Sequence, residues 1–285
     1  MGAAPAAGLV VGGVVALEGA AALATSLIPL AGTPGTVALR LGFGAVGLAV
    51  IARPDLRRLR GQPGILAVVA GGILALHHLC FYAAIHRLPL GVAVTLEFLG
   101  PLAVALAGSR RPLDLGWAAL AGLGVAMTAG LTLSGGINVP GLLFALTAGA
   151  AWAGYIVVFP RLSATLGRAE GLAVASLAGA AMAVPLGIAI DGRHLVDLHV
   201  LLIGLAVALL ADVLAYSLQA EALTRISGRL FSILTSTEPA AGALLGLVFL
   251  GQHITAWQWA GIVAVTIAAI GAVNTSRGQA APPLS

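Results

Sequence analysis

Residues 65–85 of the chain read ILAVVAGGILALHHLCFYAAI, an apolar run without any Asp, Glu, Lys or Arg. A helix needs roughly 20 predominantly apolar residues to cross the hydrocarbon core of a bilayer. The run also lacks the alternation of apolar and polar residues that marks the strands of a membrane β-barrel. It therefore predicts a transmembrane helix, and comparable runs recur along the whole chain.

The overall composition places most of the chain in a membrane. Of its 285 residues, 60% are hydrophobic and 8% are charged, whereas soluble domains average about 45–50% and about 25%. Breakers such as Gly32–Gly35, Arg110–Pro112 and Ser134–Gly136 separate the apolar runs. We expect an all-α integral membrane protein with ten transmembrane helices and no soluble domain. The predicted spans are Gly8–Leu30, Thr36–Ala52, Ile65–Ile85, Leu90–Gly108, Leu115–Leu133, Val139–Phe159, Gly171–Ile190, Val200–Ala220, Leu230–Leu250 and Thr255–Val273.

Missing residues and motifs exclude several classes of function. All fourteen basic residues are Arg, because the chain contains no Lys. A Walker A loop needs a Lys to reach the β/γ-phosphates, and a Schiff base needs its amine. The chain also lacks the H-E-x-x-H and G-x-S-x-G motifs of zinc and serine hydrolases. The sequence thus excludes an ATP-driven motor on this chain and predicts neither enzymatic activity nor a cofactor.

Basic residues set the expected orientation, since cytoplasmic loops of membrane proteins carry an excess of Lys and Arg. With the N-terminus inside, eleven Arg residues fall on the cytoplasmic side and three, Arg40, Arg87 and Arg193, on the outer side. We therefore expect a bacterial inner-membrane protein, embedded in the lipid bilayer, with both termini cytoplasmic. The Arg residues lie in separate short loops, so no nucleic-acid partner is predicted.

An internal repeat relates the two halves of the chain. When Ala84–Gly108 is placed over Ala222–Gly246 without gaps, Arg87 coincides with Arg225 and Pro101 with Pro239, along with five matched Ala, Leu and Gly positions. We expect five-helix repeats over 1–135 and 136–276, followed by a cytoplasmic tail over 277–285. An odd number of helices per repeat turns the second copy upside down. Two inverted repeats around a central cavity are typical of secondary transporters.

Glu97 is the sharpest candidate for substrate binding. It lies near the middle of the fourth span, where an ionisable group is costly, and Pro101 has no N–H to offer its carbonyl. A carboxylate beside an unpaired carbonyl would suit an ammonium group. The alternative is a protonated Glu97 that only bonds a neighbouring helix. In the second half, Pro239 frees the carbonyl of Thr235, and Glu238 fits packing as well as substrate contact.

The third span carries His77, His78 and Tyr82. His78 and Tyr82 are four residues apart and share a helix face, so they fit substrate contact or proton transfer as well as a plain helix–helix hydrogen bond. His77 is expected to point away from that face. Two adjacent His residues without further ligands at suitable spacing predict no metal site.

Further candidates lie on three other spans. Trp152 and Tyr155 fit an aromatic wall of the cavity, although anchoring at the membrane interface is the commoner role of such residues. Asp212 and Tyr216 again pair an acid with a phenol four residues apart, and Glu18 is central in the first span. All five are expected to bind substrate.

Two other features are given structural roles. Arg40 begins the second span near the outer face, so we expect its side chain to snorkel towards the interface without a role in transport. Gly42–Gly47 matches G-x-G-x-x-G but lies inside a span with no preceding strand. We expect these glycines, like Gly242–Gly246, to let helices approach closely.

Several segments resemble one family of membrane proteins. The most specific is the Leu-Glu-Phe-x-Gly-Pro block at Leu96–Pro101, and the likeness covers nearly the whole chain. It is carried by Ser26–Leu30, Ala38–Leu41, Leu88–Ala105, Ser109–Pro112, Ala151-Trp152, Tyr155, Tyr216–Leu218, Ala222–Arg225 and Glu238–Ala240. The chain resembles the threonine/homoserine exporters of the EamA-type branch of the drug/metabolite transporter superfamily.

The resemblance implies ten helices in two inverted halves and a cavity lined by the third, fourth, sixth, eighth and ninth helices. That lining would include His78, Tyr82, Glu97, Trp152 and Tyr216. Ionisable residues at Glu18, His78 and Asp212, and Gln252-His253 in place of Gly-Glu, depart from the family pattern.

We therefore expect export of small neutral amino acids by alternating access. Four buried acids and two buried His residues favour coupling to protons, with facilitated diffusion as the alternative. A carrier for another small metabolite and a membrane sensor or assembly factor that transports nothing are the alternatives.

Overall fold

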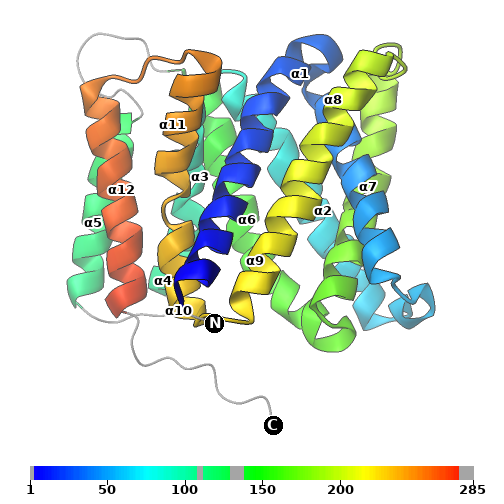
Figure 1. Cartoon of the computed structure of the whole chain (residues 1–285), viewed down its shortest axis with the longest axis horizontal. Helices are drawn as coiled ribbons and strands as arrows, with labels where there is room; N and C mark the ends of the chain where they lie inside the picture. The colour runs from blue at the N-terminus through cyan, green and yellow to red at the C-terminus, as the bar shows by residue number, and fades with distance from the viewer. Residues whose placement is uncertain (1–2, 108–111, 129–137, 276–285) are drawn as a thin grey trace.

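The computed structural model describes residues 3–107, 112–128 and 138–275, and every regular element in these ranges is a helix (Figure 1). The breakers at Arg110-Arg111 and Ser134–Gly136, the boundary at 135/136 and the tail over 277–285 lie outside the described residues. The elements are α1 (Ala3–Ala52), η1 (Leu56–Leu59), α2 (Gln62–Ile85), α3 (Leu90–Glu97), α4 (Leu99–Ala107), α5 (Pro112–Thr128), α6 (Val139–Leu166), α7 (Arg168–Asp191), α8 (Leu198–Ala208), η2 (Leu209–Ala215), α9 (Tyr216–Leu223), α10 (Gly228–Thr235), α11 (Glu238–Leu250) and α12 (Ala256–Thr275).

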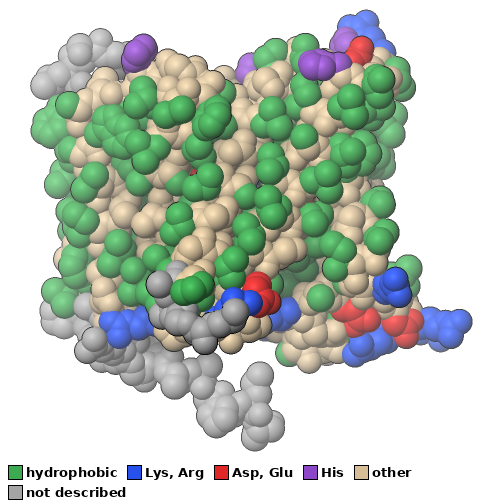
Figure 2. Space-filling model, in the orientation of Figure 1, with side chains coloured by type: hydrophobic (Ala, Val, Ile, Leu, Met, Phe, Trp, Pro, Cys, Tyr) green, Lys and Arg blue, Asp and Glu red, His purple; other side chains and the backbone are tan. Residues whose placement is uncertain are grey.

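The helices form a bundle suited to a lipid environment. In the described ranges, eight helical stretches are long and apolar enough to cross a membrane. Large apolar side chains such as Val46 and Phe249 are mostly exposed on the flanks. Figure 2 shows green apolar side chains over the visible flank, with Arg side chains mostly at its lower end. These features confirm the prediction of an all-helical membrane protein.

The long helix α1 turns back at Gly32, whose φ of 62° and ψ of 169° are not helical. The φ angle is in a region that favours glycine, and Pro34 follows within the turn. Figure 1 shows α1 rising from the N-terminus and then descending. The predicted break at Gly32–Gly35 is confirmed, and the first two predicted spans lie on either side of it.

Two helices are broken at equivalent positions of the sequence repeat. The first breaks after α3 ends at Glu97, and the second after α10 ends at Thr235, its repeat partner. Pro101 and Pro239 then occupy the first turns of α4 and α11, where a missing N–H costs no intrahelical bond. Figure 1 shows the α3–α4 pair and the α10–α11 pair running in opposite directions.

Glycines bring helices into contact, as the sequence predicted. A Cβ at Gly42 would lie 3.3 Å from Val184, and a Cβ at Gly44 would clash with the Asp212 carboxylate. A Cβ at Gly242 would lie 3.2 Å from Val94. Such small residues allow van der Waals packing between helices where lipid provides no hydrophobic driving force.

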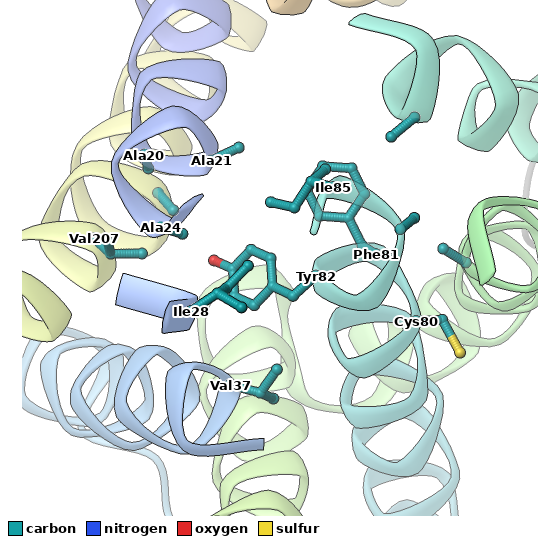
Figure 3. Close-up of a cluster of buried hydrophobic side chains, with 14 of the residues drawn as sticks. Ala20, Ala21, Ala24, Ile28, Val37, Cys80, Phe81, Tyr82, Ile85 and Val207 are labelled. Atoms are coloured by element: carbon teal, nitrogen blue, oxygen red, sulfur yellow. The ribbon is translucent and has the colours of Figure 1, made fainter. Parts of the chain in front are cut away.

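The largest apolar core joins α1, α2 and α3 with parts of α6, α7, α8 and η2. Figure 3 shows Tyr82 of α2 reaching towards Ile28 of α1, with Ala24 of α1 and Val207 of α8 nearby. Tyr82 is fully buried. The core therefore fixes α2 against α1, next to the polar cavity described below.

Candidate functional site

A cavity of about 60 Å³ lies inside the bundle between α1, α2, the α3–α4 break, α6, α9 and α11. That volume is large enough to hold water molecules. Apolar side chains line part of it, including Leu17, Phe81 and Val94. The polar and aromatic lining consists of Glu18, Arg40, His77, His78, Glu97, Trp152, Tyr216 and Glu238.

Most of the residues predicted to bind substrate meet at this cavity. Glu18, His78, Glu97, Trp152 and Tyr216 line it, and Pro101 does as well. Tyr82, Tyr155 and Asp212 do not line it; each contacts a residue that does. Pro239 lies in the first turn of α11, next to the lining residue Glu238.

At the break between α3 and α4, the side chain of Glu97 has a hydrogen-bond partner. Its Oε1 bonds Nε2 of His77, whose ring also packs on Trp152 with centroids 5.1 Å apart. His77, which was expected to point away from the face of His78 and Tyr82, lines the cavity as well. On the backbone side, a Cβ at Gly149 of α6 would lie 2.6 Å from the Glu97 carbonyl oxygen.

His78 is held by its own helix. Its Nδ1 donates to the carbonyl of Leu74 at 2.6 Å, which leaves Nε2 as the remaining polar atom of the ring. Its ring meets Tyr82 edge-on, with centroids 6.5 Å apart. The shared face of His78 and Tyr82 is therefore present, although only His78 reaches the cavity.

Three carboxyl groups form an acidic wall, which we define as Glu18 of α1, Glu97 at the end of α3 and Glu238 at the start of α11. Glu18 interacts electrostatically with both other acids. It is 4% exposed, and among the described residues its Oε2 has no hydrogen-bond partner. An unpartnered buried carboxyl oxygen is costly, which points to a cation or proton at this wall.

Arg40 lies inside the bundle, so the prediction that it snorkels to the interface is wrong. It is 5% exposed and lines the cavity. Its Nη1 donates to the Tyr82 hydroxyl at 3.1 Å, and its Nη2 donates to Asp212 Oδ1 at 3.2 Å. The turn at Gly32 brings the residue into the bundle, where Asp212 balances its charge, because an unpaired charge in a bilayer is expensive.

Asp212 lies in η2, a π-helical segment between α8 and α9. π-Segments occur mostly as short bulges in helices, frequently at functional sites. Tyr216 directly follows this segment and lines the cavity, whereas Asp212 does not. Tyr216 therefore forms part of the cavity wall, whereas Asp212 bonds Arg40 behind it. Their spacing of four residues had suggested that both would face the cavity.

Aromatic rings of α6 form one side of the cavity and pack behind it. Trp152 faces the cavity and stacks on Tyr155, whose ring lies 5.5 Å away at 12° and packs in turn on Phe159. Tyr155 is 7% exposed, so it lies behind the cavity wall and not at a membrane interface. In the described part of the chain, no three His, Cys, Asp or Glu side chains gather as a metal site would require.

The chain is similar to known exporters over most of its length. It is 41% identical over 265 residues to the threonine/homoserine exporter RhtA of Escherichia coli strain K12. The aligned region covers 92% of this chain and 89% of that protein. The RhtA of Salmonella typhimurium strain LT2 gives the same identity and coverage. Residues 139–274 match the EamA-like transporter family. The chain belongs to the EamA-like transporter family.

More distant matches agree with this membership. The chain is 28% identical over 251 residues to the uncharacterized transporter YwfM of Bacillus subtilis strain 168, with 83% of each chain covered. A protein of known crystal structure shares the fold with a TM-score of 0.64 over 95% of this chain and 98% of its own, at 22% identity. This EamA-like protein is therefore a multi-pass membrane transporter and not an enzyme, and the predicted resemblance is confirmed.

Three lining residues were undervalued from the sequence, namely Arg40, His77 and Glu238. For Arg40 a usable signal existed, since a basic residue and an acid in two apolar spans each lower their cost by pairing. Arg40 and Asp212 are such a pair. For His77 the same pairing argument was weaker, because a neutral His carries no charge for an acid to balance, although its partner Glu97 also lies in an apolar span.

Proposed function

We propose that this EamA-like transporter exports small neutral amino acids of the threonine/homoserine type across the bacterial inner membrane. The observation that carries the proposal is the acidic wall at the break between α3 and α4, in a chain that is 41% identical to exporters of that name. The solute would bind in the cavity, and the two halves of the protein would rock about it to give alternating access.

The proposed topology has ten membrane crossings. Dividing α1 at Gly32 adds one crossing to the eight apolar stretches, and the shorter apolar helix Leu113–Thr128 adds another. Residues 1–135 and 136–276 would form two inverted five-helix repeats, with a cytoplasmic tail over 277–285. The opposite directions and equivalent breaks of α3–α4 and α10–α11 support this arrangement.

The ammonium group of the solute would bind at the acidic wall. Glu18 Oε2 has no partner among the described residues, and Glu97 has one partner, His77. Charge-assisted hydrogen bonds are about twice as strong as neutral ones. Trp152 offers an apolar surface for the side chain of the solute. A positive ligand would also relieve the repulsion among the three acids.

Counterflow in proteoliposomes tests the proposed function. Vesicles loaded with unlabelled threonine should accumulate labelled threonine through the purified protein, and homoserine should compete. Aspartate and lysine, which add a net charge, should compete poorly. Accumulation of a different class of solute alone would assign the protein to another carrier type, and no counterflow with any solute would indicate a sensor or assembly role.

A further inference from the structure

The side chain of Arg40 contacts both the cavity and two residues behind its wall. It lines the cavity, but its two observed hydrogen bonds go to Tyr82 and Asp212, which lie behind the cavity wall. A guanidinium group has five N–H donors. Within the described part of the chain, the Nε–H of Arg40 is buried and has no acceptor. The guanidinium therefore retains hydrogen-bonding capacity that these two neighbours do not use.

The ion pair behind the wall is also incomplete. Only Oδ1 of Asp212 bonds Arg40, and Oδ2 is buried without a partner among the described residues. Arg and carboxylate groups frequently form two parallel hydrogen bonds, which are stronger and more directional than one. Asp212 thus balances the charge of Arg40 but uses fewer of its N–H donors than a bidentate carboxylate would.

Opposite charges therefore meet at one small cavity. Arg40 comes from the descending half of α1, and the acidic wall of Glu18, Glu97 and Glu238 comes from three other segments. Glu18 interacts electrostatically with Arg40 as well as with the other two acids. Such an arrangement is complementary to a solute that carries a cation and an anion a few bonds apart.

We propose that Arg40 binds the carboxylate of the transported zwitterion, with Asp212 and Tyr82 as positioning residues that hold the guanidinium against the cavity. The inference rests on the proposed function and adds the group that distinguishes an amino acid from a simple amine. When the cavity is empty, Asp212 compensates the buried charge. When the solute is bound, its carboxylate uses N–H donors of Arg40 that Tyr82 and Asp212 leave free.

The test compares two ligands that differ in the carboxylate alone. L-Threoninol keeps the ammonium group and side chain of threonine and replaces the carboxylate by a hydroxymethyl group. Binding of both to the purified full-length protein would be measured by calorimetry. The wild type should bind threonine roughly tenfold to a hundredfold more tightly than threoninol, as loss of a charge-assisted contact predicts.

The informative variant is the double substitution Arg40→Gln/Asp212→Asn, which removes both charges of the buried pair and leaves neither uncompensated. It should lose most of its threonine affinity and keep its threoninol affinity, so that the ratio of the two falls towards one. Arg40→Lys, which keeps the charge but not the fork, should give an intermediate ratio. Arg58→Gln/Glu170→Gln, which removes an ion pair at the membrane surface, should leave the ratio unchanged.

Each outcome decides the matter. A wild-type preference for threonine that survives in the Arg40→Gln/Asp212→Asn variant would overturn the role of Arg40. Equal losses for both ligands, with a lowered melting temperature, would make Arg40 purely structural. Wild-type protein that binds threonine and threoninol equally would overturn the carboxylate site alone, whereas binding of neither would overturn the proposed function and the inference with it.

Discussion

At the scale of single residues, the charged groups of the site described above lie either beside a partner or at the cavity. Glu97 pairs with His77, and Arg40 pairs with Asp212. Glu18 lacks a partner at one oxygen among the described residues, but it faces the cavity. Because each such group is expensive in hydrocarbon, their concentration around one small space is the strongest physical mark of a binding site.

Glu97→Gln tests the contribution of one carboxylate to solute binding. The change keeps size and hydrogen bonding to His77 but removes a charge that would bind the ammonium group. A lost contact of about 1.5–3 kcal/mol should weaken threonine binding roughly tenfold to a hundredfold. Calorimetric affinity and melting temperature would be measured on the same purified variant.

The matched control is Glu221→Gln, which removes a carboxylate that pairs with Arg225 in an exposed position. This variant should bind threonine as the wild type does. If Glu97→Gln also binds normally, Glu97 serves only to join helices and leaves the list of binding residues.

At the scale of elements, the broken helices and the glycine contacts beside them shape the site. Where α4 meets α6, a Cβ at Gly100 would clash with the carbonyl of Gly149, and a Cβ at Gly149 would lie 2.6 Å from the carbonyl of Glu97. The break is therefore packed backbone against backbone. Any side chain added here must displace the segment that carries Glu97.

Gly149→Ala should therefore destabilise the protein and impair transport together. Overpacking a close contact costs roughly 1–3 kcal/mol, and the displaced segment would move Glu97 and His77 relative to the cavity. Thermal unfolding in detergent and counterflow in vesicles would measure the two effects. Gly122→Ala is the control, because its Cβ would meet nothing within 4 Å; a loss as large in this variant would show that helix composition, not the contact, is responsible.

The sequence predicted these elements unevenly, for physical reasons. Glycine and proline mark breaks locally, so the turn at Gly32 and the kinks before Pro101 and Pro239 were foreseeable. The π-segment around Asp212 has no such local signature, since ordinary apolar residues surround it. The positions of Arg40 and His77 depend on partners from other helices, which hydropathy does not encode.

At the scale of the whole molecule, basic side chains gather at the end where α1 begins and α12 finishes (Figures 1 and 2). Membrane proteins concentrate Lys and Arg on the cytoplasmic side. The same bias was counted from the sequence, so the predicted orientation and the described structure agree on which end carries the charge. Which side of the membrane that end faces stays a prediction.

Cysteine labelling tests the orientation. Cys80 is the only native cysteine and would first be replaced by Ala. A cysteine introduced at His253, in the loop between α11 and α12, should react with a membrane-impermeant thiol reagent in intact cells. A cysteine at Leu56, in η1, should react only after the membrane is permeabilised; the reverse pattern would contradict both cytoplasmic termini.

Proton coupling is a separate prediction for the whole molecule. Acidic side chains commonly relay protons in pumps and transporters, and three of them line this cavity. Export should therefore accelerate severalfold when a proton gradient is imposed at constant membrane potential. Rates of labelled threonine efflux from vesicles would measure this, and equal rates with and without the gradient would indicate facilitated diffusion.

The π-segment Leu209–Ala215 sets the register of the residues that follow it. A π-turn holds one residue more than an α-turn, so conversion of the segment to α-helix would advance everything beyond it by one position. One position is a rotation of about 100° and a shift of about 1.5 Å. Tyr216, the first residue of α9, would then leave the cavity wall, while Arg40 would lose its fixed counterion. A shift of one residue in this helix would thus change the contacts of Tyr216 and Arg40, with no movement of the helices that line the opposite side of the cavity.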